Sequence, residues 1–338
     1  MKIAVIGAGS WGTALARLLA EKGETVSLWA FEEAVVNAIE HHRENRRYLT
    51  GVSLPKNLTA SCEMQKVLAG AKLVLFAVPS QYARPILSLM SPIISAEIPI
   101  VSASKGIEIK TLLPISEVIR EGLHRESAHK IAVLSGPSFA QEVAQGHPTA
   151  VTLASENHRL ALRLQHIFST PFFKLLVTSD IIGVQLGGAL KNVIAIAAGI
   201  SDGLGFGFNT KAILAARGLS EITSLGIAMG ADVNTFYGLS GLGDLFLTCS
   251  GALSRNRKVG ELLGQGTQLT TILRKMQMVA EGVETTRSAV ALSKKYKVPL
   301  PIVQEVYQVL FKGKPPKQAV VDLMAQAYGK EIPLEIKR

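Results

Sequence analysis

The sequence has very few cysteines, only Cys62 and Cys249 among 338 residues, and they lie far apart in the chain. Two such cysteines imply no disulfide framework, and they do not have the spacing of a metal site. A low cysteine content is typical of proteins of the reducing cytosol. We therefore expect a cytoplasmic protein that binds no metal.

A long uninterrupted hydrophobic run is also absent. The most apolar stretch, residues 181–200, contains Gln185, Lys191 and Asn192, so we expect no membrane span. The first strand-like residues begin at Ile3, which leaves no room for a signal peptide.

The chain carries a formal net charge of +10, but its lysines and arginines are spread along the sequence in short clusters. A solvated basic surface accounts for this distribution, and we expect no nucleic-acid partner. The positive charge gives mild support to a small anionic substrate.

The length predicts two domains, and the first half of the chain contains seven short β-branched runs. These runs occupy residues 3–6, 25–29, 72–78, 99–102, 131–134, 150–153 and 172–177. A helical pattern from Gly12 to Glu21 separates the first two. Continuous apolar strands with helices between them predict an α/β fold, a parallel sheet covered on both faces. From about residue 180 the pattern becomes rich in Ala, Leu and Ile, which predicts an all-α C-terminal domain.

A glycine-rich turn, Gly7-Ala-Gly9-Ser-Trp-Gly12, lies between the first strand and the helix. Gly7 permits a tight turn, Gly9 lets a pyrophosphate approach the backbone, and Gly12 lets the helix pack closely on the sheet. The phosphates would lie at the helix N-terminus. We therefore predict a dinucleotide-binding Rossmann-type doubly wound domain at residues 1–185, and an all-helical substrate-binding domain at residues 186–338.

Glu32 lies 20 residues after Gly12, just past the second strand, where an acid binds the ribose hydroxyls of a dinucleotide. A second carboxylate follows it, and the pair would repel a 2′-phosphate, which favours NAD over NADP. Three arginines further along could reach back and leave NADP open: Arg43, Arg46 and Arg47. Phe31 is either a partner for the adenine or an ordinary packing aromatic.

Two further loops follow strands, at residues 77–80 and 102–106, and both should face the cofactor. Lys105 lies in the second loop among small residues, although a surface lysine is the alternative. Gly136 and Ser138 follow the next strand and could donate to an anion, or they form a simple turn.

Lys191 lies in a helix that is apolar on several faces. A lysine there must be paired, neutral or open to a cleft, unless it extends to the surface. Desolvation would lower its pKa toward the range that is useful for proton transfer. Asn192 beside it could orient a substrate hydroxyl.

Asp244 and Thr248 are four residues apart and share a helix face. Asp244 either holds Lys191 or caps its own helix. Ser254, Arg255 and Asn256 concentrate donors suited to a phosphate. The alternative is that Ser254 is a helix cap in front of a solvated basic turn.

Six ordered motifs resemble those of the soluble NAD(P)-dependent sn-glycerol-3-phosphate dehydrogenases of the bacterial type. They are G-A-G-S-W-G-T-A at 7–14, S-K-G at 104–106, G-P-S-F-A-x-E at 136–142, K-N at 191–192, G-L-G-D at 241–244 and S-R-N at 254–256. The resemblance spans nearly the whole chain. It implies interconversion of dihydroxyacetone phosphate and sn-glycerol 3-phosphate for phospholipid synthesis, and a homodimer.

The resemblance also implies roles for single residues. The proton donor and acceptor falls on Lys191. The substrate contacts fall on Lys105, Gly136, Ser138, Asp244, Ser254, Arg255 and Asn256. The cofactor contacts fall on Ser10, Trp11, Lys105, Ala140, Arg255, Val279 and Glu281. Bacterial members often carry a basic residue or histidine after the second strand, whereas W-A-F-E-E at 29–33 looks like the NAD-preferring eukaryotic cytosolic members.

Together the residues predict hydride transfer to a ketone carbon, with Lys191 protonating the oxygen and Lys105 stabilising its charge. Two alternatives stay open. One is a related hydroxyacid dehydrogenase of the β-hydroxyacid or ketopantoate type. The other is a non-catalytic dinucleotide-sensing protein, which would have no need of a buried proton donor at Lys191.

Overall fold

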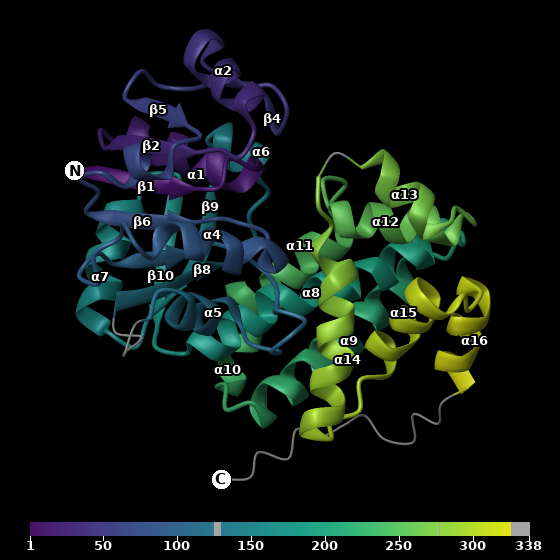
Figure 1. The fold of residues 1–338 in the computed structure, drawn as a ribbon. Coiled ribbons are helices and arrows are strands. Elements are labelled where there is room, and N and C mark those ends of the chain that lie inside the picture. The colour runs from purple at the N-terminus through teal and green to yellow at the C-terminus, as the bar shows by residue number, and fades with distance from the viewer. Residues whose placement is uncertain (125–129, 277, 326–338) are drawn as a thin grey trace.

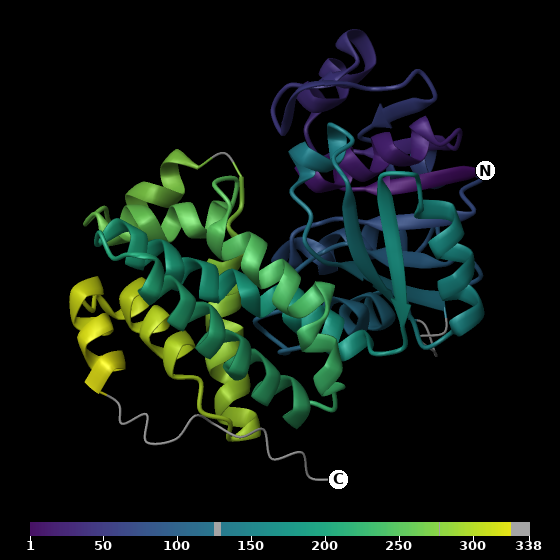
Figure 2. The same ribbon diagram turned by 180° about the vertical axis from the view of Figure 1, so that it is seen from behind.

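The computed structural model describes residues 1–124, 130–276 and 278–325. A sheet with covering helices forms the first part of the chain, and a cluster of helices forms the second (Figure 1). The N-terminus, where the first strand begins, lies on the side of the sheet away from the helical part, and the view from behind shows the same arrangement (Figure 2).

The sheet has eight strands in the order β10-β9-β8-β7-β6-β1-β2-β5. Their bounds are β1 (Lys2–Ile6), β2 (Thr25–Trp29), β5 (Leu58–Ser61), β6 (Leu73–Phe76), β7 (Ile100–Ser102), β8 (Ile131–Ser135), β9 (Thr149–Ala154) and β10 (Phe173–Thr178). All seven strands expected from the sequence are present, which confirms the α/β prediction. The sequence did not predict β5, nor the separate hairpin of β3 (Glu44–Asn45) and β4 (Leu49–Ser53), because these strands are short and half exposed.

One pair of strands departs from the expected parallel sheet. Neighbours pair in parallel except β8 and β9, which are antiparallel. The segment between them holds only the short helix α6 (Ala140–Ala144). A full crossover helix would be needed to return the chain in parallel, whereas an antiparallel strand can follow a short connection.

Alternate residues of the strands enter two different cores. In β1, Ile3 and Val5 pack with one set of apolar side chains, and Ala4 and Ile6 pack with another. The first set includes residues of α1 (Ser10–Glu21), α2 (Glu33–His42) and α7 (His158–Phe168). The second includes residues of α3 (Met64–Leu68), α4 (Ala83–Met90) and α5 (Ile115–Gly122). The sheet is therefore covered on both faces, as a doubly wound fold requires.

Helix α8 (Ile181–Gly203) is the centre of the helical part and packs against helices α9, α11, α12 and α14. By length and composition it could cross a membrane, but 94% of its most apolar window is buried inside the protein, which is typical of a central core helix. The other elements are α9 (Phe208–Ala228), α10 (Val233–Tyr237), the π-helical turn η3 (Leu239–Gly243), α11 (Asp244–Ser250), α12 (Arg255–Gly264), α13 (Leu269–Lys275), α14 (Glu281–Tyr296), α15 (Pro301–Lys312) and α16 (Pro316–Ala325).

The change from sheet to helices falls between the end of β10 at Thr178 and the start of α8 at Ile181. No strand occurs beyond it within residues 180–276 and 278–325. The proposed division between residues 185 and 186 lies inside α8, so this helix would belong mostly to the second domain while its first turn packs against the sheet.

Candidate active site

The glycine-rich turn has the geometry that a pyrophosphate site requires. Gly7 has φ +111°, and a Cβ there would lie 2.6 Å from the Ala77 carbonyl oxygen. A Cβ on Gly12 would lie 1.9 Å from the Gly7 carbonyl oxygen, so helix and turn can be this close only with glycine. A Cβ on Gly9 would meet nothing within 4 Å. The N-terminus of α1 therefore opens onto free space at Gly9, where a phosphate can approach.

Three further residues expected to contact the cofactor lie around this turn. Ser10 and Trp11 begin α1, and Ser10 Oγ donates to the Met278 sulfur at 3.2 Å. Ala140 begins α6 and packs in the same small apolar cluster as Trp11. The structure thus brings the start of α6 against the glycine-rich turn from 130 residues away.

Glu32 lies immediately before α2, and its carboxylate has two partners from the β3–β4 hairpin. Tyr48 Oη donates to Glu32 Oε1 at 2.7 Å, and Arg47 Nη1 lies 3.7 Å from the same oxygen. Phe31 is 80% exposed, which rules out the alternative of an ordinary packing aromatic. Sequence reasoning missed Tyr48, because the hairpin that carries it was not predicted.

The other two arginines do not reach Glu32. Arg43 donates to the carbonyl oxygens of Leu54 and Leu58, at 3.2 and 2.7 Å, and so ties the end of α2 to the start of β5 and the chain before it. Arg46 pairs with Glu44 at 3.3 Å. Of the three candidates for a 2′-phosphate, only Arg47 lies beside the acid.

Asp244 joins the two expected catalytic lysines. Its Oδ1 accepts a hydrogen bond from Lys191 Nζ, and its Oδ2 accepts one from Lys105 Nζ at 2.8 Å. Lys191 also donates to Thr248 Oγ1 at 2.7 Å, and Lys105 donates to the Gly136 carbonyl oxygen at 3.1 Å. Three elements distant in sequence, α8, α11 and the loop after β7, therefore meet at one carboxylate.

The environment of this cluster explains its electrostatics. The pKa of Lys191 is lowered to about 8, because the effect of burial, together with the nearby positive charge of Lys105, outweighs the opposite effect of Asp244. Asp244 is fully buried, and Gly243 holds the cap position of α11, so the helix-cap alternative for Asp244 is wrong. Two cations share one anion in a place of low dielectric, which leaves positive charge available for a developing oxyanion.

A second group of donors lies at the N-terminus of α12. Ser254 Oγ accepts from the Arg257 amide at 3.2 Å, which confirms that Ser254 caps this helix. Neighbouring protein atoms partly desolvate Arg255, which lowers its pKa. The residue nevertheless remains exposed to solvent. A helix N-terminus that carries a solvent-accessible arginine is suited to bind an anion.

The side chains of Asn256 and Asn192 are hydrogen-bonded to each other. Asn256 donates to Asn192 Oδ1 at 2.9 Å and accepts from the Gly282 amide at 2.9 Å. These bonds join α8, α12 and the start of α14. Arg255 reaches the same place, because its Nη1 donates to the Val279 carbonyl oxygen at 2.9 Å. The structure therefore places Val279 and Glu281 beside the expected phosphate contacts.

Ser138 lies at the edge of the lysine cluster, where its hydroxyl donates to the Gly136 carbonyl oxygen at 2.9 Å. That carbonyl is the one to which Lys105 also donates. Within the described residues, no group of three or more His, Cys, Asp or Glu side chains could hold a metal ion.

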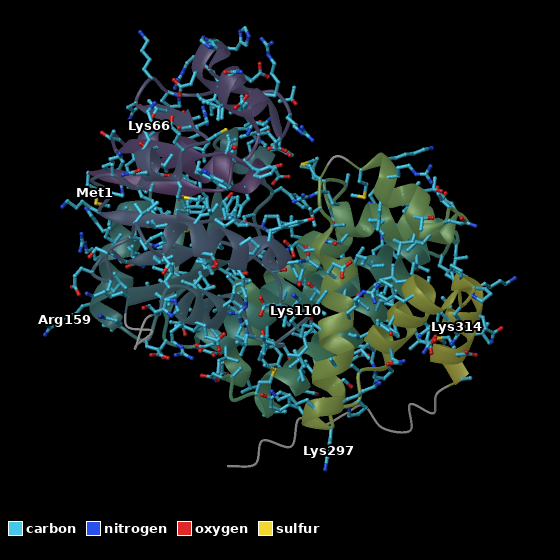
Figure 3. All side chains as sticks on the ribbon, viewed as in Figure 1. Met1, Lys66, Lys110, Arg159, Lys297 and Lys314 are labelled. Atoms are coloured by element: carbon cyan, nitrogen blue, oxygen red, sulfur yellow. The ribbon has the colours of Figure 1, made fainter. Side chains whose placement is uncertain are left out.

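The two lysines of this cluster differ in exposure from lysines and arginines at the molecular surface. Figure 3 shows Lys66, Arg159 and Lys297 pointing outward on different sides of the molecule. These three cations extend into solvent, whereas Lys191 is buried and Lys105 is partly buried.

Comparisons with known proteins match both parts of the chain. Residues 2–161 match the family model "NAD-dependent glycerol-3-phosphate dehydrogenase N-terminus", and residues 180–321 match the corresponding C-terminus. The glycerol-3-phosphate dehydrogenase (NAD(P)+) of Geobacter sp. strain M21 is 53% identical over 96% of this chain and 97% of its own length.

Solved structures agree with this result. The glycerol-3-phosphate dehydrogenase of Coxiella burnetii superimposes with a TM-score of 0.92 at 38% identity, covering 96% of this chain and 99% of that one. A ketopantoate reductase from Ralstonia eutropha reaches a TM-score of 0.60 at 16% identity, covering 95% of this chain and 100% of its own, which shows a shared fold alone.

Proposed function

The chain belongs to the NAD-dependent glycerol-3-phosphate dehydrogenase family, and from this premise we propose that dihydroxyacetone phosphate and sn-glycerol 3-phosphate are interconverted at its Lys191–Asp244–Lys105 cluster. As a member it is an NAD(P)-dependent oxidoreductase that acts on a small phosphorylated substrate. The observation that carries the proposal is that one buried carboxylate, that of Asp244, holds two lysines at the carboxyl end of the sheet.

The roles within the cluster follow from its hydrogen bonds. A bound nicotinamide supplies the hydride for the ketone carbon. Lys191 gives a proton from Nζ to the oxygen during reduction and takes it back during oxidation, since its lowered pKa suits both directions. Lys105 stabilises the charge on that oxygen, and Asp244 with Thr248 fixes the direction of the Lys191 ammonium.

The phosphate of the substrate would bind at the start of α12. Arg255 and Asn256 there provide a charged fork and a neutral donor, and the helix dipole adds to both. Ser254 supports the site as the cap of the helix, and Asn192 orients Asn256. Binding of the phosphate would use remote interactions to orient the carbonyl against Lys191.

The cofactor would extend from the turn at Gly7, Gly9 and Gly12 toward the lysines. Ser10, Trp11 and Ala140 would contact its phosphates, and Phe31 would pack near its adenine. Glu32 would bind the ribose hydroxyls, so we propose that NAD is preferred. Arg47 lies 3.7 Å from Glu32 and gives the same place a cation for NADP. Lys105, Arg255, Val279 and Glu281 would contact the nicotinamide half.

The resemblance also supports three broader proposals. The protein would act in the cytoplasm, it would form a homodimer, and its product would enter glycerophospholipid synthesis. Sedimentation of the purified protein across a range of concentrations tests the dimer, since a mass of 36.1 kDa throughout would contradict it.

A substrate panel tests the proposed reaction. We expect the protein to oxidise NADH with dihydroxyacetone phosphate, and to leave ketopantoate and simple β-keto acids unreduced. NADPH would be measured in parallel. Faster turnover of a keto acid would support the hydroxyacid dehydrogenase alternative, and the absence of any turnover would support a dinucleotide sensor.

A further inference from the structure

Glu281 of the helical part is hydrogen-bonded to Ser80 of the sheet part, and Ser80 has no role in the proposed reaction. Glu281 begins α14 and reaches the loop after β6. Its Oε1 accepts from the Ser80 amide at 3.0 Å, and its Oε2 accepts from Ser80 Oγ at 2.6 Å. Ser80 is only 1% exposed. A carboxylate that accepts both donors of one residue is held in a defined orientation.

The same carboxylate acts on Arg255. Desolvation lowers the pKa of Arg255, and the charge of Glu281 opposes that shift. The Arg255 guanidinium meanwhile donates to the carbonyl oxygen of Val279, two residues before Glu281. The start of α14 and the chain just before it therefore hold both partners: Glu281 accepts from a buried serine of the sheet domain, and the Val279 carbonyl, two residues earlier, accepts from the arginine that we assign to the substrate phosphate.

The contact is also packed against the loop that carries Lys105. A Cβ on Gly106 would lie 2.3 Å from Ser80 Oγ and 2.9 Å from Glu281 Oε2, so only glycine allows this approach. Gln81 ties the two loops together, because its Nε2 donates to Ser80 Oγ at 3.2 Å and to the Ile107 carbonyl oxygen at 2.8 Å. Movement of Ser80 would thus disturb the spacing between Lys105 and Arg255.

We propose that Ser80 is a positioning residue, which holds Glu281 and through it sets Arg255 at a fixed distance from Lys105. This inference rests on the proposed function, since it assumes that Arg255 binds the substrate phosphate while Lys105 faces the carbonyl. Ser80 itself touches neither reacting atom. At saturating NADH its effect should therefore be seen only with substrates that carry a phosphate.

The test compares Ser80→Ala with Ser88→Ala, a matched control in which an exposed serine loses its bond to the Arg84 carbonyl oxygen. We expect Ser80→Ala to lower kcat/KM for dihydroxyacetone phosphate about tenfold, mainly through KM, since the bond involves a charged acceptor. Turnover of unphosphorylated dihydroxyacetone should not change. Ser88→Ala should match the wild type with both substrates.

A double-mutant cycle separates positioning from general damage. In an Arg255→Ala background, Ser80→Ala should cost less than about twofold, because the residue through which it acts is gone. Equal losses with the two substrates, or an undiminished loss in the Arg255→Ala background, would overturn the proposal. If Ser80→Ala does not fold, Glu281→Gln replaces it, because the amide oxygen can still accept from Ser80 while the charge is removed. Because Glu281 is also expected to contact the cofactor, Glu281→Gln is measured at saturating NADH, where kcat/KM for dihydroxyacetone phosphate should still fall; an unchanged kcat/KM there would overturn the proposal.

Binding of inorganic phosphate distinguishes failure of this inference from failure of the proposed function. Stabilisation against thermal unfolding by phosphate should be weaker in Ser80→Ala than in the wild type, whether or not dihydroxyacetone phosphate is turned over. Equal stabilisation would reject the positioning role. A wild-type protein that binds phosphate but does not reduce dihydroxyacetone phosphate would reject the proposed reaction alone.

Discussion

Two carboxylates in this molecule have similar partners but very different surroundings. Asp244 accepts from two lysines, and Glu32 lies beside an arginine and accepts from a tyrosine. The side chain of Asp244 is 1% exposed, whereas that of Glu32 is 30% exposed. Charge interactions are strong and weakly screened when buried, and they are weak and sensitive to salt at the surface. The first site can therefore shift a pKa for chemistry, while the second can only adjust a preference between two cofactors.

The largest expected effect comes from removing the buried amine. Lys191→Ala should lower kcat for dihydroxyacetone phosphate by about a hundredfold or more, the usual contribution of a positioned acid–base group. KM for NADH should barely change, because Lys191 is bonded to Asp244 and Thr248 rather than to the glycine-rich turn. Steady-state kinetics on this variant and on Lys110→Ala, an exposed lysine, provide the measurement and its control. A kcat near that of the wild type would contradict the assignment.

Arg255→Ala should have the next largest effect. A hydrogen bond to a charged group contributes about 1.5–3 kcal/mol, so kcat/KM with dihydroxyacetone phosphate should fall by roughly 10- to 150-fold. At saturating NADH, unphosphorylated dihydroxyacetone should be reduced as well as by the wild type. If Arg255 binds only the cofactor pyrophosphate, the loss should follow NADH concentration and be equal for the two substrates.

The buried pair also predicts a pH profile. Lys191 has its pKa lowered from 10.5 to about 8, so the protonated donor is lost as pH rises through about 8. Ketone reduction should then fall by about tenfold per pH unit above that value, and alcohol oxidation should gain. Asp244 raises this pKa, so Asp244→Asn should move the break to lower pH. A break that stays in place in Asp244→Asn would mean that another group titrates.

The surroundings of the buried Asp244 were more predictable from the sequence than those of the exposed Glu32. A lysine in an apolar helix must have a partner, and this requirement correctly pointed to Asp244 for Lys191. Strands such as β6, β7 and β8 were predictable because they are continuous buried runs, and β2 and β10 because they are rich in apolar residues although partly exposed. The hairpin with Tyr48 and the short strand β5 were not, because their residues are half exposed and lack a clear period.

Contacts across the chain were the least predictable feature. Ser80 and Glu281 are separated by 201 residues, and Tyr48 reaches Glu32 only because the β3–β4 hairpin folds back over α2. The sequence indicated that the loop at residues 77–80 faces the cofactor, but no sequence pattern identifies Glu281 as the partner of Ser80. The antiparallel pairing of β8 and β9 was not predicted either, because strand direction depends on the connection between the strands rather than on their composition.

The smallest expected effect concerns the exposed carboxylate. Glu32→Gln removes the charge that repels a 2′-phosphate and frees Arg47, so the ratio of kcat/KM for NADPH over NADH should rise by about fivefold, which corresponds to about 1 kcal/mol for an exposed pair. Arg47→Gln should shift the ratio in the opposite direction. Arg46→Gln is the control, since Arg46 pairs with Glu44 and not with Glu32. High salt should reduce the Glu32→Gln effect, because about 1 M salt screens charges beyond roughly 3 Å. The kcat loss of Lys191→Ala should persist under the same conditions, since its partner is buried. If salt weakened both effects equally, the contrast between the buried and the exposed carboxylate would be wrong.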